Sequence, residues 1–222
     1  GDGTVLRFDD GFFFGEIQGD QFSGGRRGDK PGTFLLQRFN LMPPSLGAQP
    51  PEGAIVLFDG SGFDAWGRFP KGSGWDMLEG GILQANPNLG TIETRRKFGD
   101  CRLHLEFRIP LLPDARGQER GNSGVFLQHY YEVQILDSYG LPGYWNECGA
   151  IYRISAPYVN MCLPPQQSQT YDIEFRAARF DEEGNLLENA RMTVLHNGVA
   201  VQKDQEMPRG TSGDAKKQIG RA

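Results

Sequence analysis

Cysteine is scarce in this chain, which has only Cys101, Cys148 and Cys162 among its 222 residues. None of them has the CxxC spacing that is typical of a structural zinc site, so the sequence argues against such a site. An odd number of cysteines leaves at least one thiol unpaired. A Cys148–Cys162 disulfide and two small buried thiols are equally acceptable interpretations, and the cysteines therefore leave the redox compartment open.

The sequence also lacks the signatures of nucleic-acid, membrane and nucleotide binding. It has no block of basic residues and its formal net charge is −5, which argues against a nucleic-acid partner. No apolar run reaches the roughly 18 residues that a membrane-spanning helix needs. Glycine-rich phosphate loops, dinucleotide fingerprints and G-x-S-x-G elbows are absent as well, so no nucleotide cofactor is expected.

Glycine, phenylalanine and proline are abundant instead, with 31, 15 and 14 residues. Glycine and proline mark turns, and phenylalanine favours strands. No stretch of the chain shows sustained helical periodicity. Many short strands joined by tight turns are typical of an all-β jelly-roll sandwich, which is the predicted fold class.

Three regions follow one another along the chain. We expect a partial small β region without chemistry at residues 1–41, and a sandwich domain at residues 54–222. Between them, residues 42–53 contain four prolines and should form a linker or a wrap over the surface. The first strands expected in these regions are Val5–Phe8, Phe12–Phe14, Thr33–Leu36 and Ala54–Phe58.

Alternation of apolar and polar residues is clearest at residues 101–109, where every odd position is apolar and every even position is polar. This pattern predicts a strand with one buried face. We expect it and residues 131–136 to be central strands, with Leu103, Leu105, Val133 and Ile135 buried. Other expected features are strands at Gly124–Gln128, Gly149–Ile154, Tyr171–Arg176 and Arg191–His196, a tight hairpin at Asn197-Gly198 and a turn at residues 183–185.

Glu132 and Gln134 are the leading candidates for chemistry. Side chains alternate between the two faces of a strand, so Glu132, Gln134 and Leu136 should share the wet face while Val133 and Ile135 point into the core. A carboxylate and a carboxamide two residues apart suit proton transfer and oriented hydrogen bonding. The alternative interpretation is ordinary solvent exposure.

The spacing Glu132-x-Gln134-x-x-Asp137 is similar to the Glu-x-Asp-x-x-Glu strand of certain retaining glucanases, in which a bulge returns the last carboxylate to the groove. A retaining mechanism needs two carboxyl groups about 5–5.5 Å apart. A conventional retaining glycoside hydrolase that uses Glu132 and Asp137 is therefore an alternative function. A carbohydrate-binding module without chemistry is another.

His104 and Glu106 share the polar face of the strand expected at residues 101–109. Together with Glu132 they would form a metal or acid–base cluster if the two strands were neighbours. The alternative is that both side chains simply face solvent.

Several segments resemble the 3-keto-disaccharide hydrolase family, also described as the 3-keto-glucoside 1,2-lyase/3-keto-2-hydroxyglucal hydratase domain. The similarity covers about residues 53–211. It implies a concanavalin A-like β-sandwich, a saccharide or glycoside as substrate, and a location outside the cytoplasm. The segments that carry it are AIVLFDGSGFDAW, FGDCRLHLEFRIP, ARGQERGNSGVFLQ, YEVQILDSYG, ECGAIY, VNMCLPP, TYDIEFRAARFD and ARMTVLHNGV.

The resemblance also implies a mechanism. A ketone at C3 of the sugar acidifies the C2 proton, a base removes that proton, the C1 substituent leaves by elimination, and water adds to the glycal. Glu132 is the expected base, with His104 as the second candidate. We expect Asn122, Gln134, Asp137 and Tyr152 to bind the substrate. A divalent metal is a candidate cofactor, with His104, Glu106 and Glu132 as its candidate ligands.

Two departures from the family pattern stand out. Ser168 replaces the tryptophan that usually precedes Gln-Thr-Tyr. The family continues past Thr211 through a Leu-Gln-x-His-Gly segment into a strand with Arg-Asn-Ile-Trp, whereas this chain ends in SGDAKKQIGRA. We therefore expect a sandwich that lacks its last strands and one histidine, in a chain cut at both ends.

Overall fold

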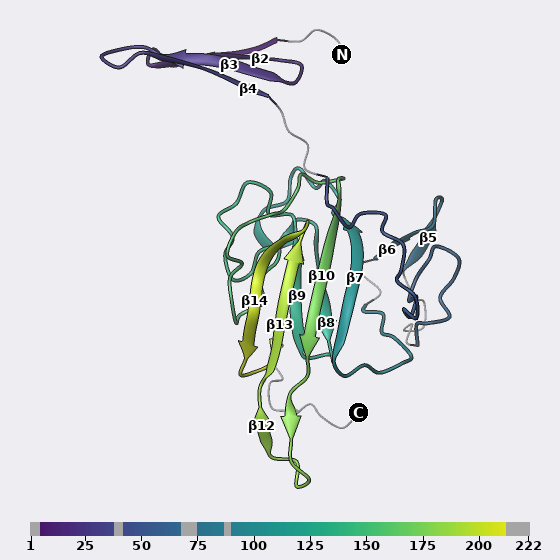
Figure 1. Ribbon diagram of the computed structural model, residues 1–222. Coiled ribbons are helices and arrows are strands. Elements are labelled where there is room, and N and C mark those ends of the chain that lie inside the picture. The colour runs from purple at the N-terminus through teal and green to yellow at the C-terminus, as the bar shows by residue number, and fades with distance from the viewer. Residues whose placement is uncertain (1–4, 38–41, 68–74, 87–89, 212–222) are drawn as a thin grey trace. The chain divides into compact units, whose positions relative to one another are not determined.

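The computed structural model describes residues 5–37, 42–67, 75–86 and 90–211. The chain divides into two compact units, Gly1–Met42 and Pro43–Ala222, and each is described by itself. Regular structure in the described residues is almost entirely antiparallel strand, and its one helical element is a short 3₁₀ turn at Gly117–Glu119 (Figure 1). The expected all-β class is confirmed.

The first unit is a four-stranded antiparallel sheet in which neighbours along the chain pair with each other. Its strands are β1 (Val5–Asp9), β2 (Phe13–Gln18), β3 (Gln21–Arg26) and β4 (Gly32–Gln37). The Phe22 ring packs against Phe8 and Phe34, with centroids 5.7 and 4.9 Å away. Sequence analysis missed β3, because its two glycines weaken the strand pattern.

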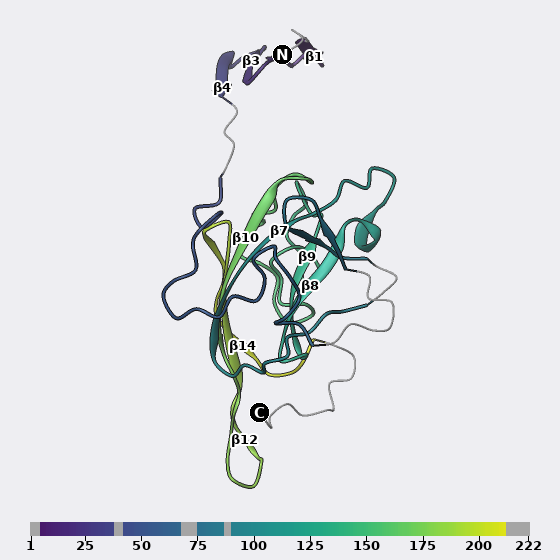
Figure 2. The same ribbon diagram turned by 90° about the vertical axis from the view of Figure 1, so that its right-hand side faces the viewer.

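The second unit is a sandwich of two layers, which face each other in Figures 1 and 2. One layer has the strand order β14-β13-β10-β7, and the other pairs β8 with β9. The strands are β7 (Cys101–Arg108), β8 (Asn122–Leu127), β9 (Tyr131–Leu136), β10 (Ser168–Arg176), β13 (Ala190–His196) and β14 (Val199–Met207). Two small hairpins pair β5 (Asp76–Leu78) with β6 (Ile82–Gln84) and β11 (Arg179–Phe180) with β12 (Leu186–Glu188). The expected jelly-roll sandwich is confirmed.

The hydrophobic core lies between these two layers. Val133 and Ile135 of β9 are buried in it, as expected, and Leu103 and Leu105 of β7 pack against it while remaining partly exposed. The hydroxyl of Tyr171 in β10 crosses the core and donates a 2.7 Å hydrogen bond to the backbone carbonyl of Gln134. A buried tyrosine needs such a partner for its hydroxyl, and this bond links the two layers.

The turn at Asn197-Gly198 is confirmed as the hairpin between β13 and β14. Asn197 has φ 52° and Gly198 has φ 81°, so both central residues adopt the left-handed region that a type I′ turn requires. A side chain at residue 198 would also clash with Pro44, because a Cβ there would lie 2.4 Å from its Cγ. Only glycine meets both conditions.

Three strand expectations are wrong in detail. Residues 54–58 pair with no strand, and Ile55 and Val56 are about half exposed, because an apolar run does not by itself supply a partner strand. Residues 149–154 form only isolated bridges, Val133↔Ile151 and Ile151↔Ser155. β7 was expected to be a central strand but lies at the edge of its layer among the described strands. Alternation of apolar and polar residues predicts a buried face, but it does not predict how many strands pair with β7.

Residues 43–48 lie over the outer face of β7 and β10. Ser45 Oγ donates a 2.7 Å hydrogen bond to Asp172 Oδ2, and the Gly47 N–H donates to Glu106 Oε1. This part of the proline-rich segment therefore wraps over the sandwich. The expectation about closing strands concerns residues 212–222, which lie outside the described residues.

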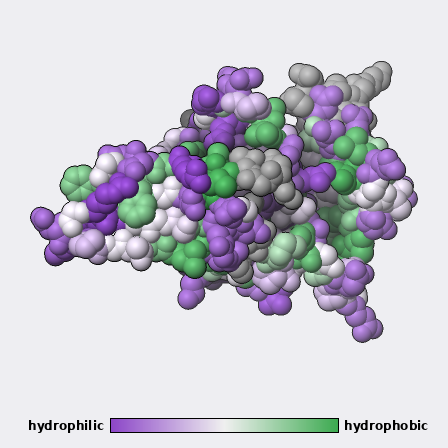
Figure 3. All heavy atoms as spheres, turned by 90° about the horizontal axis from the view of Figure 1, so that it is seen from above, coloured by the Kyte–Doolittle hydropathy of each residue, from purple (hydrophilic) through white to green (hydrophobic). Residues whose placement is uncertain are grey.

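Hydrophobic residues on the face seen from above lie in separate groups among hydrophilic ones (Figure 3). Scattered exposed apolar residues of this kind are normal for a globular protein. Among the residues that the structure describes, no helix is long and apolar enough to cross a membrane.

Candidate active site

Glu132 points away from the core on the outer face of the β8–β9 layer, because its neighbours Tyr131 and Val133 are buried in the core. Its carboxylate lies over Gly124 of β8, where an added Cβ would be only 2.3 Å from Oε1. Glu132 is partly buried, and this burial raises its pKa, while the positive charge of Arg153 acts in the opposite direction. A partly desolvated carboxylate with a raised pKa is a stronger base than an ordinary glutamate.

Gln134 occupies the same face, but the expectation that this face is wet is wrong at this position. Only 2% of Gln134 is exposed. Its side-chain N–H group donates to Gln118 Oε1 at 3.1 Å and to the Asn146 carbonyl at 3.3 Å. Its Oε1 is buried and accepts no hydrogen bond from any described residue. A buried carboxamide oxygen without a hydrogen-bond partner is costly in a folded protein. Gln134 Oε1 therefore has the capacity to accept a hydrogen bond from a bound molecule.

Gln118 organises this part of the site, and sequence analysis missed it. It lies in the 3₁₀ turn after Gly117 and donates a 2.9 Å hydrogen bond to the Asn146 carbonyl. Its backbone carbonyl accepts a 2.8 Å hydrogen bond from the Asn122 side chain. Gln118 thus holds together two of the predicted binding residues, Asn122 at the start of β8 and Gln134 in β9.

An aromatic pair lies beside Glu132. The backbone N–H of Tyr152 donates to the Glu132 carbonyl at 3.0 Å, and the Tyr152 ring packs edge-on against Trp145 at 5.4 Å. Trp145 is 46% exposed. The Arg153 guanidinium lies 5.3 Å from the Tyr152 ring centroid. Aromatic rings that reach the surface next to polar groups are suited to stack against a sugar ring.

Arg153 adopts a left-handed backbone conformation, with φ 60°. This conformation is uncommon for a residue with a long side chain, and such residues concentrate at functional sites. Arg153 lies two residues after Ile151, which pairs with Val133 of β9, and the chain turns away from β9 at this point. Neither Trp145 nor Arg153 was predicted. An exposed tryptophan and tyrosine in a glycine- and proline-containing loop, residues 142–145, was the signal available.

Asp137 does not join Glu132. It is 1% exposed, and its carboxylate lies 2.7 Å from the guanidinium of Arg120. It lies five positions after Glu132, which corresponds to roughly 16 Å along an extended chain. Asp137 is therefore placed to hold the turn that carries Gln118 and Arg120 against the end of β9.

His104 and Glu106 lie on the opposite layer, on the outer face of β7. His104 Nδ1 is 2.7 Å from Asp172 Oδ1, and its Nε2 is 3.7 Å from Glu106 Oε1. The two layers of a sandwich are about 10 Å apart, and these side chains point away from Glu132, so the expected His104–Glu106–Glu132 cluster is not assembled. The described residues contain no group of three or more His, Cys, Asp or Glu side chains arranged for a metal ion. The predicted ligand set does not fit a metal.

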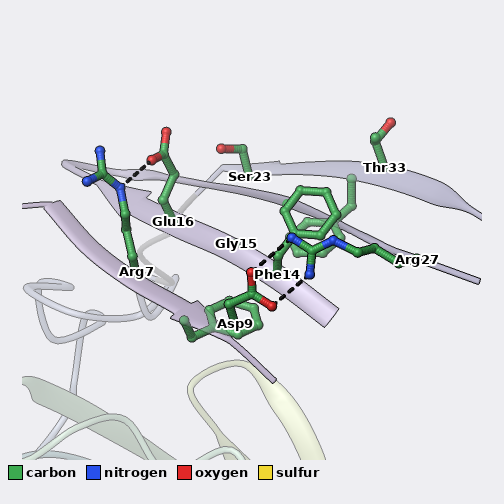
Figure 4. A pocket seen from close by; sticks show the side chains of 11 residues that line it. Arg7, Asp9, Phe14, Gly15, Glu16, Ser23, Arg27 and Thr33 are labelled. Atoms are coloured by element: carbon green, nitrogen blue, oxygen red, sulfur yellow. Dashed lines mark hydrogen bonds and ion pairs between the residues drawn. The ribbon is translucent and has the colours of Figure 1, made fainter. Parts of the chain in front are cut away.

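A shallow depression lies on the sheet of the first unit (Figure 4). The Arg27 guanidinium there pairs with Asp9 at 2.7 and 2.9 Å and lies 4.4 Å above the Phe14 ring. Arg7 and Glu16 form a second pair at 3.1 Å. These exposed charges neutralise one another, and such pairs each contribute only about 0–1 kcal/mol. The depression therefore offers no unpaired acid or base comparable with Glu132.

The chain is similar to one protein family and to two solved structures. A family model for the 3-keto-α-glucoside-1,2-lyase-like domain matches residues 53–220. The crystal structure of a proposed glycosyl hydrolase from Parabacteroides distasonis is 38% identical, covers 77% of this chain and 70% of its own, and superimposes with a TM-score of 0.67. A second proposed glycosyl hydrolase from the same organism is 17% identical over 73% of this chain and 75% of its own, with a TM-score of 0.45. No curated protein matches.

The matched region contains every predicted site residue, from His104 to Tyr152. It also contains the residues that sequence analysis missed, Gln118, Trp145 and Arg153. The family match extends over well more than half of the chain, and the closer of the two structures described above shares both sequence and fold with it. The chain belongs to the 3-keto-α-glucoside-1,2-lyase-like family of carbohydrate-active proteins.

Proposed function

We propose that this protein cleaves 3-keto-glycosides by elimination followed by hydration, with Glu132 as the base. The observation that carries the proposal is the partly buried Glu132 carboxylate, held over Gly124 and next to the aromatic pair of Trp145 and Tyr152. Burial raises the pKa of Glu132, and a base gains strength as its pKa approaches the working pH.

The reaction proceeds in two steps. Glu132 takes the C2 proton, which the C3 ketone acidifies, and the electrons of the C2–H bond form an enolate. The enolate expels the C1 substituent with the electrons of the C1–O bond and leaves a keto-glycal. Water then adds across the double bond, its hydroxyl group to C1 and a proton to C2, so that the net result is hydrolysis.

The neighbours of Glu132 supply binding and charge. The Trp145 and Tyr152 rings stack against the sugar, and the Asn122 side chain orients a hydroxyl group. The Arg153 guanidinium, whose charge already acts on Glu132, stabilises the negative charge that develops on the enolate oxygen. No step requires His104 or a metal ion.

The alternative of a retaining glycosidase is less well supported. That mechanism needs a second carboxylate about 5–5.5 Å from the first, whereas Asp137 lies roughly 16 Å farther along the chain and is paired with Arg120. A binding module without chemistry would use the same aromatic pair but would gain nothing from a raised pKa at Glu132. The location outside the cytoplasm stays part of this proposal.

The test compares three carboxylates on a 3-keto-glucoside and an ordinary glucoside. Glu132→Gln should lower kcat/KM on the keto substrate by about 10²–10⁴-fold, because a general base is lost, while substrate binding persists. Glu106→Gln, on the outer face of the other layer, is the matched control and should leave the rate unchanged. Asp137→Asn should cost much less than Glu132→Gln.

Three outcomes would contradict the proposal. Equal losses in Glu132→Gln and Asp137→Asn, with cleavage of the ordinary glucoside, would favour the retaining glycosidase. Binding of the keto substrate without turnover by the unmodified chain would favour a binding module. Full activity of Glu132→Gln would remove Glu132 from its role as the base.

A further inference from the structure

Two buried thiols lie directly behind the candidate site and have no role in the proposed reaction. Cys148 is 1% exposed and Cys162 is 6% exposed, and both belong to the hydrophobic core. Cys148 belongs to the segment that also carries Trp145 and Tyr152, and Cys162 lies shortly before β10. Their contacts bring these two segments together.

Both cysteines gather around the end of β9. The Cys148 N–H donates a 3.0 Å hydrogen bond to Ser138 Oγ, and Ser138 Oγ in turn donates to the Leu136 carbonyl at 3.3 Å. The Cys162 thiol lies 3.5 Å from that same Leu136 carbonyl. The Cys148 thiol is also 3.1 Å from the Tyr171 hydroxyl.

The two thiol groups interact with each other as well. Their mutual interaction is the main reason why the pKa of Cys162 is lowered, whereas burial raises the pKa of Cys148. Cys101 lies apart from them: it opens β7, opposite Phe175, and the charge that acts on it is that of Asp100. Of the three cysteines, only Cys148 and Cys162 are neighbours.

We propose that Cys148 and Cys162 form a disulfide that ties the segment carrying Trp145 and Tyr152 to the start of β10. A small-molecule disulfide such as oxidised glutathione is the oxidant. The Cys162 thiolate attacks one of its sulfur atoms and releases one glutathione thiol. The Cys148 thiolate then attacks the mixed disulfide and releases the second, so two electrons pass from the cysteines to the oxidant.

The burial of both thiols determines at which stage of folding the disulfide can form. Since neither thiol is open to solvent in the folded state, exchange takes place as the chain folds or during local opening. A bridge between residues 148 and 162 closes a short loop, which limits the conformations of the unfolded chain and so favours the folded one. Disulfides of this kind persist in oxidising compartments, in keeping with the location outside the cytoplasm proposed above.

The test uses the full chain, refolded in a mixture of reduced and oxidised glutathione. After quenching and denaturation, free thiols are alkylated with N-ethylmaleimide and the protein is weighed and mapped by mass spectrometry. We expect a single adduct, on Cys101, and a cross-linked pair of peptides that contain Cys148 and Cys162. The matched control, Cys101→Ser, should carry no adduct and keep the same cross-link.

Alkylation of all three cysteines after refolding to the folded state would overturn the proposal, and so would a cross-link that includes Cys101. The oxidised chain should also melt at a higher temperature than the chain refolded in reductant alone. An equal or lower melting temperature would contradict the claim that the bridge stabilises this region.

Discussion

Replacing Gly124 by alanine should displace the Glu132 carboxylate without unfolding the sandwich. A Cβ built at residue 124 would lie 2.3 Å from Glu132 Oε1, 2.9 Å from its Cγ and 3.0 Å from its Cδ. Ordinary van der Waals contact begins near 3.4 Å, so the oxygen has to retreat by about 1 Å. The clash involves the Glu132 side chain from Cγ outward and no backbone atom, so rotation of this side chain about its Cα–Cβ bond can relieve it.

The expected effect on activity is large and the effect on stability is small. A displacement of about 1 Å of a reacting group typically costs on the order of 10²-fold in rate, and we expect this loss in kcat/KM on the keto substrate. Gly124 does not have the positive φ that would forbid alanine. At such a position, a change from glycine to alanine tends to stabilise a protein by about 0.4–1 kcal/mol through the unfolded state.

The assay measures kcat/KM against pH and thermal melting for Gly124→Ala and for Gly99→Ala as the matched control. No atom lies within 4 Å of a Cβ built at Gly99, and its φ is not positive. The carboxylate displaced in Gly124→Ala should lose part of its burial, so the acid limb of its pH profile should move to lower pH. Full activity in Gly124→Ala with an unchanged profile would refute the placement of Glu132 over Gly124.

Three further predictions concern stability. Glu132→Gln should raise the free energy of unfolding at pH 7 and leave it unchanged well below pH 4. The reason is that burial raises the pKa of Glu132 in the folded state, so its charged form destabilises the fold only at pH values above the pKa of the unfolded chain. Denaturant titration at both pH values checks this, and equal stability of the variant and the unmodified protein at pH 7 would contradict it. Burial lowers the pKa of His196 to about 3. As the pH falls below about 6.5, the unfolded chain therefore binds a proton at this residue that the folded chain does not bind. The free energy of unfolding of the unmodified protein should drop by about 2 kcal/mol between pH 7 and pH 5, and His196→Gln should not show this drop. Arg120→Ala leaves the buried Asp137 carboxylate without its partner and should cost about 3–5 kcal/mol in urea unfolding; a loss below about 1 kcal/mol would show that the pair is not buried as described.

Local patterns predicted the parts of the fold that depend on local chemistry. The alternation at residues 101–109 indicated β7, and Asn197-Gly198 indicated the hairpin, because side-chain period and backbone turn type are both set within a few residues. The run at residues 54–58 failed as a strand because pairing requires a partner elsewhere in the chain. The same limit explains residues 149–154, which touch β9 through Ile151 alone.

The site was predictable only in part, for the same reason. Glu132 and Tyr152 were predicted, and the structure places them side by side. Gln134 was expected in solvent, but the turn that carries Gln118 and the carbonyl of Asn146 cover it. The alternation of residues along β9 does not indicate which other segments of the chain cover this strand. Burial of Gln134 by such a segment could therefore not be predicted from the pattern.

His104 shows the opposite error. The sequence correctly predicted that His104 and Glu106 lie on the polar face of one strand. A site on that face can gain further residues only from strands that neighbour it in the same sheet. β7 and β9 lie in different layers, and the partner that the structure gives His104 is Asp172 of β10. Layer assignment is a property of topology, which strand spacing alone does not encode.

The most direct test of the central claim follows the C2 hydrogen of a 3-keto-glucoside during turnover in heavy water. If Glu132 removes that proton before elimination, the product should carry deuterium at C2 by NMR or mass spectrometry, a keto-glycal should be detectable on the way, and Glu132→Gln should abolish both signals. Cleavage that leaves the C2 hydrogen in place, with no glycal, would contradict the account.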